Sequence, residues 1–351
     1  MTETDLEISP ADASLRPFDA IWDIRLAPHE PAFPSAAQLT YREAISPSES
    51  LTRGDSVLIV CDIGVRSKKA AQALREQGFR NVVSLTGGAD ALLRYRATIG
   101  DTPLTSDDAL RYDRQIRLSR FGLEGQKRLR DATVVVVGAG GLGCPALSYL
   151  ATAGVGHIEI VDHDAVELTN LQRQPLYRTE DVGRPKVDAA AERLAHLNPT
   201  IDIVTDSRTV TSKNAGKVVA RATVVIDATD NFDARYALNE ATVQGDIPLI
   251  YGSVYGFEGQ FAVFDAASGP CYRCVFPASP AGDAVLDCAT VGVLGAVTGV
   301  VGALQASAAL QIAGGVDHDL LGALTMFDGR TGRFDRMSTG KVPGCMTCGS
   351  N

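Results

Sequence analysis

The sequence has little positive charge for its length. Of its 351 residues, 33 are Lys or Arg and 42 are Asp or Glu, which gives a formal net charge of -9. Affinity for nucleic acid depends on clustered Lys and Arg that replace counterions on phosphates, so this balance argues against a nucleic-acid partner. With 45% hydrophobic and 21% charged residues, the chain also lacks the composition of a disordered protein.

The sequence is equally poor in segments that mark export or membrane insertion. Residues 1–10 are polar and acidic and lack the basic and apolar succession of a secretory signal, so the cytoplasm is the expected compartment. Only the stretch 291–316 is free of charge for long enough to span a bilayer. Because it is rich in Gly and Ala and contains Gln305 and Gln311, we expect a buried helix at an interface rather than a membrane span.

The length predicts about two domains, and a polar run at 97–103 resembles a linker between them. We therefore divide the chain into residues 1–96, a linker at 97–109, and residues 110–351. Apolar runs in the first part indicate short strands at 21–24, 57–60 and 82–85, with helices at 67–77 and 89–96. In the second part, strand candidates at 133–137, 157–161, 201–204, 223–227 and 248–252 alternate with helices, which is typical of an α/β fold with a parallel sheet covered on both faces.

A cysteine follows the second strand of the first part. Cys61 opens the loop Cys-Asp-Ile-Gly-Val-Arg-Ser, which leads into a helix. Backbone N–H groups and the helix dipole at such a turn favour a thiolate, and Arg66 adds a cation, so Cys61 could carry a persulfide. The alternative is that Cys61 is a small buried residue at a strand end.

The first 96 residues resemble a rhodanese domain, whose active loop reads Cys-x-x-Gly-x-Arg-Ser and whose next strand ends in a Gly-Gly turn. The resemblance implies that Cys61 takes up sulfane sulfur as a persulfide. The segment Trp-Asp-Ile-Arg at 22–25 fits the family, whereas residues 32–36 replace its customary His-Ile-Pro-Gly-Ala stretch.

A glycine loop follows the strand at 133–137. Its glycines, Gly138, Gly140, Gly141 and Gly143, permit a tight turn in which a phosphate approaches backbone amides at a helix N-terminus. Asp162 closes the next strand, where a carboxylate can accept hydrogen bonds from ribose hydroxyls. This pattern indicates a nucleotide and is shared with nicotinamide-dependent dehydrogenases.

Phosphate-neutralising charges follow other strand ends. Arg173 and Lys186 could hold a triphosphate, and Asp230 could hold magnesium. A metal-bound triphosphate suits nucleotidyl transfer and is not needed for hydride transfer, so the set favours an ATP-using enzyme over a dehydrogenase. Each charge alone could be a solvated surface group, and the interpretation depends on their joint placement.

These motifs together resemble the MoeB/ThiF (HesA) family, the bacterial relatives of ubiquitin-activating enzymes, over residues 110–350. The resemblance implies a doubly wound, Rossmann-like, mostly parallel sheet, an ATP site, magnesium at Asp230, and a homodimer. Arg114 matches an arginine that reaches the ATP phosphates of the partner subunit, although the basic residues at 111–130 could be the polar face of a helix. The residues implied at the nucleotide also include Thr169, Asn170, Leu171, Gln172, Arg173, Gln174 and Asn231.

Four of the seven cysteines form two Cys-x-x-Cys pairs. Four thiolates suit a structural zinc with no open ligand position, although a redox pair or chance is possible. The MoeB/ThiF family has the same four ligands. They are Cys271, Cys274, Cys345 and Cys348.

Cys144 and Cys288 remain. Cys144, in the first turn after the glycine loop, is expected to be a packing residue. In the MoeB/ThiF family a cysteine at the position of Cys288 lies on a loop over the adenylate, which implies attack on the activated carrier or resolution of an acyl persulfide. The alternative is an ordinary buried thiol.

The hypothesis that follows is a two-step activation. The resemblance implies that ATP adenylates the C-terminal glycine of a small ubiquitin-like sulfur carrier of the MoaD/ThiS type, and that the Cys61 persulfide, charged by a donor such as a cysteine desulfurase, forms a thiocarboxylate. The pathway served could be molybdopterin, thiamin, tRNA thiolation or cysteine synthesis. Two alternatives stay open: adenylation of a small-molecule or amino-acid carboxylate, and a non-catalytic nucleotide-binding scaffold.

Overall fold

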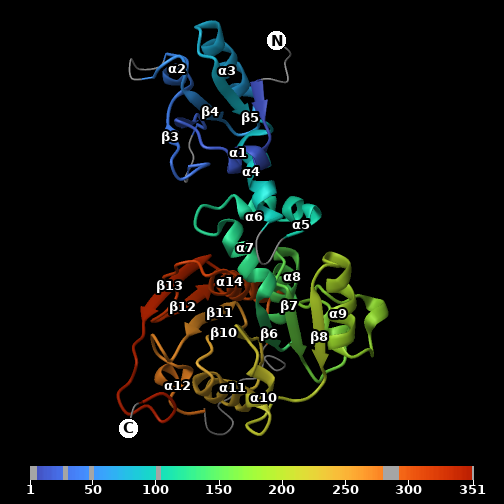
Figure 1. Ribbon diagram of the computed structural model, residues 1–351. Helices are drawn as coiled ribbons and strands as arrows, with labels where there is room; N and C mark the ends of the chain where they lie inside the picture. The colour runs from blue at the N-terminus through green and yellow to red at the C-terminus, as the bar shows by residue number, and fades with distance from the viewer. Residues whose placement is uncertain (1–5, 27–30, 47–50, 100–103, 280–291, 350–351) are drawn as a thin grey trace. The chain divides into compact units, whose positions relative to one another are not determined.

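The computed structural model describes residues 6–26, 31–46, 51–99, 104–279 and 292–349 (Figure 1). Its backbone packing divides the chain into two compact units, Met1–Leu123 and Glu124–Asn351. The sequence-based boundaries at 96 and 110 stay a prediction. In the structure, short helices after residue 97 pack with the first unit, where one buried cluster contains Ala97, Leu104, Ala109, Tyr112 and Ile116.

The first unit is a five-stranded parallel sheet with helices on both faces. Its strands are β1 (Glu7–Ile8), β2 (Ala20–Asp23), β3 (Ala37–Gln38), β4 (Ser56–Val60) and β5 (Asn81–Leu85), and its helices are α1 (Pro10–Leu15), α2 (Tyr41–Ala44), α3 (Val65–Glu76), α4 (Gly88–Ala97), α5 (Ser106–Arg111) and α6 (Asp113–Ile116). The strand order is β1-β5-β4-β2-β3. Val57 and Ile59 pack with α3, whereas Leu58 and Val60 pack with Leu92 of α4. Both faces of β4 are therefore buried, which explains its unbroken apolar run.

The second unit is an eight-stranded, mostly parallel sheet. Its strands are β6 (Thr133–Val137), β7 (His157–Val161), β8 (Asp202–Asp206), β9 (Val224–Asp227), β10 (Leu249–Tyr255), β11 (Glu258–Phe264), β12 (Ala323–Asp328) and β13 (Arg333–Ser338). Its helices are α7 (Gly122–Asp131), which begins at the boundary, α8 (Gly143–Ala153), η2 (Leu168–Asn170), η3 (Thr179–Asp181), α9 (Lys186–Leu197), α10 (Ala215–Val219), α11 (Phe232–Gln244), α12 (Tyr272–Val275) and α14 (Gly295–Gly314).

The strand order of this sheet is β13-β12-β11-β10-β9-β6-β7-β8. Strands β10, β9, β6, β7 and β8 run parallel, and β11, β12 and β13 extend the sheet in antiparallel fashion. Leu249 and Tyr251 pack with the residues of α10 and α11, whereas Gly252 faces Gln305 of α14 on the other side. The sheet is thus doubly wound, as the sequence predicts.

The expected strands and helices of the first unit are present with ends within two residues. All five expected strands of the second unit are also present. The sequence does not predict β1, β3, β12 or β13. Strands β1 and β3 have only two residues each, and β13 is exposed along its whole length, so it has no apolar face that would give a periodic pattern.

The uncharged stretch forms α14, which by length and composition alone could cross a membrane. This helix packs against α8 and β10 inside the second unit (Figure 1). Its fully buried Gln305 donates from Nε2 to the carbonyl of Asp227 at 2.7 Å and to that of Ile250 at 3.2 Å. This buried polar side chain therefore ties α14 to β9 and β10, as expected of a core helix.

A buried ion pair lies at the carboxyl end of β9. Arg235 Nε is 2.9 Å from Asp227 Oδ2, and the side chains are 5% and 0% exposed. Arg235 Nη2 also donates to the carbonyl of Thr229 at 2.7 Å, and its guanidinium lies 4.9 Å from the ring centre of Tyr251. Burial disfavours the charge of Arg235, but the Asp227 carboxylate outweighs this and raises the pKa of the guanidinium.

We expect Arg235→Met to destabilise the second unit by about 3–5 kcal/mol, because it leaves the Asp227 carboxylate buried without its counter-charge. The double variant Asp227→Leu/Arg235→Met removes both charges and should recover part of that loss. Urea unfolding of the full chain measures both. Equal destabilisation of the single and double variants would contradict the electrostatic explanation.

Candidate functional site

The order of the parallel strands reverses between β6 and β9. From β6 the chain proceeds to β7 and β8 on one side and then returns to β9 on the other. In open α/β sheets the crevice beyond the carboxyl ends of the strands at such a reversal is the usual ligand site. The glycine loop after β6 and the Thr229–Asn231 turn after β9 both lie there.

Two glycines of the loop are required by its geometry. Gly138 has a φ of +99°, and a Cβ there would lie 2.5 Å from the carbonyl oxygen of Ala228. A Cβ on Gly143 would collide with the carbonyl of Gly138. Gly140 and Gly141 leave more room, and both line the cavity. The loop therefore needs Gly138 and Gly143 for its fold and exposes the other two to a ligand.

A cavity of about 430 Å³ occupies this position. Most residues predicted to bind the nucleotide line it, and they come from the ends of several strands. They are Gly138, Gly140, Gly141, Asp162, Asn170, Arg173, Gln174, Lys186, Asp230 and Asn231. Gly143, Thr169, Leu171 and Gln172 do not line it; Thr169 instead accepts a hydrogen bond on its carbonyl from Arg173.

The first charged wall of the cavity follows β7. Asp162 accepts the backbone N–H of Ala139 on Oδ2 at 2.7 Å and that of Asp164 on Oδ1 at 2.8 Å. The Lys186 side chain is only 7% exposed, and its Nζ lies 2.7 Å from Asp164 Oδ2. This wall is therefore a fixed arrangement of two carboxylates and one ammonium group, anchored to the glycine loop.

The second wall follows β9. Asp227 accepts the backbone N–H and the hydroxyl of Thr229, at 3.0 and 2.6 Å. Asn231 caps α11 by accepting the N–H of Ala234 at 3.1 Å. These bonds hold the turn that carries the exposed carboxylate of Asp230 into the cavity.

Several residues that line the cavity are not among those predicted from the sequence, and three of them are Arg208, Arg235 and Thr298. Arg208 follows the end of β8 and pairs with Asp206 at 2.6 Å, so its place after a strand could have identified it. Arg235 looks like part of an ordinary helix, and Thr298 lies in an apolar one. No local pattern marks those two.

In the first unit the loop after β4 surrounds the sulfur of Cys61, which is 1% exposed. Its Sγ accepts the backbone N–H of Ser67 at 3.3 Å, in the first turn of α3. Gly64, with a φ of +86°, makes the turn into that helix. The structure thus places a helix N-terminus against the sulfur, as the sequence predicts.

Arg66 acts on the loop rather than on the sulfur. Its Nη2 donates to the carbonyl of Ile24 at 2.9 Å and to the carboxylate of Asp62 at 3.3 Å. The arginine therefore joins the loop to the segment after β2, and its role in favouring a thiolate stays a prediction.

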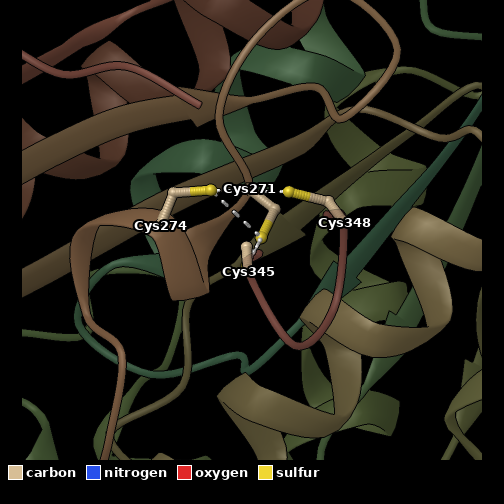
Figure 2. A group of neighbouring side chains, drawn as sticks. All are labelled: Cys271, Cys274, Cys345 and Cys348. Atoms are coloured by element: carbon tan, nitrogen blue, oxygen red, sulfur yellow. Dashed lines mark hydrogen bonds between the residues drawn. The ribbon is translucent and has the colours of Figure 1, made fainter. Parts of the chain in front are cut away.

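The four cysteines of the two Cys-x-x-Cys pairs converge at one point of the second unit (Figure 2). The sulfur pairs Cys271–Cys274, Cys271–Cys345 and Cys274–Cys348 are 3.9, 3.7 and 3.4 Å apart. The backbone N–H of Val342 donates to the sulfur of Cys274 at 3.4 Å. Burial raises the pKa of the Cys271 thiol. All four side chains could hold one metal ion.

Three predicted residues remain, Cys144, Arg114 and Cys288. Cys144 is buried, its Sγ is 3.4 Å from the carbonyl of Ala139, and burial raises the pKa of its thiol to about 12, which fits a packing role. Arg114 belongs to the first unit, where its exposed side chain is 3.4 Å from a carboxylate oxygen of Asp113. Cys288 lies outside the described residues.

Comparison with solved structures shows the fold of about two thirds of the chain. The chain is similar to the crystal structure of E. coli MccB with ATP, at 24% identity and a TM-score of 0.58 over 68% of this chain and 74% of that one. It is also similar to E. coli MccB with MccA-N7isoASN, at 24% identity and a TM-score of 0.62 over 69% and 75%.

Two curated relatives are more similar in sequence. The adenylyltransferase and sulfurtransferase MOCS3 of Culex quinquefasciatus is 48% identical over 251 residues, 71% of this chain and 57% of that protein. The sulfur carrier protein adenylyltransferase of Thermus thermophilus is 45% identical over 250 residues, 70% of this chain and 92% of that protein. The chain thus spans only a little over half the length of the MOCS3 relatives it matches.

Two family models match the chain in separate places. The rhodanese-like domain matches residues 21–94. The ThiF family model matches residues 112–347, about two thirds of the chain. The chain therefore belongs to the ThiF family and carries a rhodanese-like domain before the ThiF region.

Proposed function

We propose that this protein adenylates the C-terminal glycine of a small ubiquitin-like sulfur carrier and converts it to a thiocarboxylate with sulfur held on Cys61. The observation that carries the proposal is that one chain combines two sites. One is a glycine-loop cavity lined by Arg173, Lys186 and Asp230, and the other is a cysteine loop at a helix N-terminus. The names of the relatives, an adenylyltransferase and sulfurtransferase and a sulfur carrier protein adenylyltransferase, support it.

The nucleotide would lie along the glycine loop. Both oxygens of Asp162 already accept backbone N–H groups, but each carboxylate oxygen has a further lone pair for a ribose hydroxyl. Gly140 and Gly141, which line the cavity, let the phosphates approach the amides at the start of α8. The sugar is thus held on the β7 side of the cavity and the phosphates at the glycine loop.

The cations and carboxylates of the cavity would act on the phosphates. Lys186 and Arg173 neutralise charge on the pyrophosphate as it leaves, and Arg114 from a second copy in a homodimer adds to them. The exposed carboxylate of Asp230 offers the oxygen ligands that magnesium prefers. Magnesium, when bound, would supply further charge neutralisation on the triphosphate.

The chemistry then has two parts. A carboxylate oxygen of the carrier attacks the α-phosphorus, the bond to pyrophosphate breaks, and the carrier becomes an acyl-adenylate. The terminal sulfur of the Cys61 persulfide attacks the activated carbonyl carbon and AMP leaves. Cys288 would then attack the Cys61 sulfur of the acyl persulfide, which forms a Cys61–Cys288 disulfide and releases the thiocarboxylate; a thiol reductant restores both cysteines.

The cysteine cluster would hold a structural zinc. Zinc–sulfur bonds of about 2.3 Å in a tetrahedron place sulfurs about 3.8 Å apart, and the sulfur separations of 3.4–3.9 Å fit that geometry. Four thiolates leave no position for substrate, so the metal would stabilise the fold by joining residues 345–348 to α12.

The proposal implies three partners: a carrier with a C-terminal Gly-Gly, a sulfur donor such as a cysteine desulfurase, and a second copy of the chain. Thiolate chemistry of this kind suits a reducing cytoplasm. Adenylation of a small carboxylate by the same cavity is the second candidate, and it predicts activity without a carrier protein.

We expect Asp230→Asn to lower ATP–pyrophosphate exchange by about 100-fold or more, because it removes a charged ligand at the phosphates. Exchange is measured with the carrier present. Asp233→Asn is the matched control, since Asp233 lies three residues further on and does not line the cavity. Exchange that needs no carrier would contradict a protein substrate and favour the small-carboxylate alternative.

We expect Cys61→Ser to leave exchange intact and to stop thiocarboxylate formation, because adenylation does not use this sulfur. Intact mass of the carrier after incubation with ATP and a sulfur donor distinguishes carboxylate from thiocarboxylate. An unchanged thiocarboxylate yield would remove the rhodanese-like domain from the reaction.

We expect Cys345→Ser to reduce bound zinc from one ion per chain to almost none and to lower the midpoint of thermal unfolding by several degrees. Cys144→Ala, which removes a cysteine outside the cluster, is the control for zinc content. Metal analysis and a thermal melt measure the two effects. Full zinc content in Cys345→Ser would rule out a four-cysteine site.

A further inference from the structure

Two buried serine hydroxyls form a chain of contacts that begins at the sulfur of Cys61. Ser67 and Ser84 are both 0% exposed. Ser67 Oγ lies 3.2 Å from Cys61 Sγ, and Ser84 Oγ lies 2.8 Å from Ser67 Oγ. Three elements therefore bring one chain of polar atoms together: the end of β4, the first turn of α3 and the strand β5.

Ser84 is a polar residue in an otherwise apolar part of β5. Its neighbours Val82, Val83 and Leu85 are apolar and buried. A hydroxyl in such a position costs stability unless it is hydrogen-bonded. The described partners of the Ser84 hydroxyl are Ser67 Oγ and, at 3.4 Å, the carbonyl of Gly64.

The two hydroxyls have only two hydrogens between them. Ser67 Oγ contacts Cys61 Sγ, the Gly64 carbonyl at 3.1 Å and Ser84 Oγ. If Ser67 gives its hydrogen to Ser84, the sulfur receives none from it. If Ser84 donates to Ser67, the Ser67 hydrogen is left for the sulfur or the Gly64 carbonyl, and an anionic sulfur is the stronger acceptor.

We propose that Ser67 donates its hydroxyl hydrogen to Cys61 Sγ whenever that sulfur is anionic, and that Ser84 is the positioning residue that directs it there. This inference rests on the proposed sulfur-transfer function. The Ser67 hydroxyl is then a second donor beside the Ser67 backbone N–H, so the sulfur receives two hydrogen bonds from one residue.

The step that benefits is the departure of Cys61 as a thiolate. With thiosulfate as donor, the Cys61 thiolate attacks the outer sulfur, a sulfur–sulfur bond forms, and sulfite leaves with the electron pair of the broken bond. With cyanide as acceptor, cyanide attacks the terminal sulfur of the persulfide, thiocyanate forms, and the pair returns to Cys61 Sγ. The thiolate is the reactant of the first step and the leaving group of the second.

Four charged groups on or next to the elements around the loop have partners of their own. Arg66 bonds Asp62. Just after β2, Arg25 is 2.6 Å from Asp23. On α3, Lys68 is 3.0 Å from Glu7 of β1, and on α4, Asp90 is 2.7 Å from Arg117. Because replacing Ser84 disturbs none of these ion pairs, a change in the titration of Cys61 would report on the hydroxyls.

The test follows the pH dependence of Cys61 alkylation in the full chain, measured by mass spectrometry of the Cys61 peptide. We expect Ser67→Ala to move the midpoint of this profile upward by about one to two pH units, the effect of a hydrogen bond to a charged group. Ser84→Ala should move it upward by about half to one unit. The double variant should shift it no further than Ser67→Ala, because Ser84 acts only through Ser67.

Two further variants separate this effect from a fault in folding. Ser84→Thr keeps the hydroxyl on a buried strand and should restore the wild-type midpoint. Ser56→Ala removes a hydroxyl from β4 that bonds Asp19 instead of the cysteine loop, and it should leave the midpoint unchanged. Thiosulfate–cyanide sulfur transfer at neutral pH should fall about 3- to 10-fold in Ser84→Ala, in proportion to the loss of thiolate.

A wild-type midpoint in Ser84→Ala, or shifts of the single variants that add in the double variant, would overturn the proposal. A different result tests the proposed function. Absence of sulfur transfer by the wild-type chain would refute that function, whereas the alkylation profile would still report on the two serines.

Discussion

The buried ion pair between Asp227 and Arg235 is the interaction on which the second unit depends most. Asp227 ends β9, and its carboxylate holds both Arg235 and Thr229. Its carbonyl receives Gln305 of α14 from the opposite face of the sheet. A pair of charges this deeply buried is stable only when every hydrogen bond around it is made. The positions of the sheet, of α14 and of the turn that carries Asp230 therefore depend on one another.

The same pair connects the cavity to the cysteine cluster. The guanidinium of Arg235 lies over the ring of Tyr251, and Tyr251 packs against Tyr272 with ring centres 5.4 Å apart. Tyr272 directly follows Cys271, and its N–H donates to Asn239 of α11. The polar centre at the end of β9 and the four sulfurs are thus two ends of one packed aromatic layer, which gives the metal site a structural connection to the cavity.

The two units share one local arrangement. In each, an apolar parallel strand is followed by a short loop that contains a glycine with positive φ, Gly64 at +86° and Gly138 at +99°, and the loop leads into a helix. The turn exposes backbone N–H groups at the helix N-terminus, where negative charge is stabilised. In the first unit this loop surrounds the sulfur of Cys61, and in the second it lines a cavity of about 430 Å³.

Local patterns in the sequence were enough to predict the α/β class, the glycine loop, the cysteine loop and the two Cys-x-x-Cys pairs, because each of these depends on residues close together along the chain. They did not reveal β13, whose residues are all exposed, or the roles of Arg235 and Thr298, which look like ordinary helix residues. They also gave no reason for Ser84, a polar residue in a buried strand. Those features depend on contacts between segments far apart in the chain. Ser84 reaches Ser67, which contacts Cys61, only when β5 pairs with β4, and Arg235 meets Asp227 only when α11 packs on the sheet. Tertiary structure alone decided them, because a buried hydroxyl or charge acquires its role from the partner that folding brings to it.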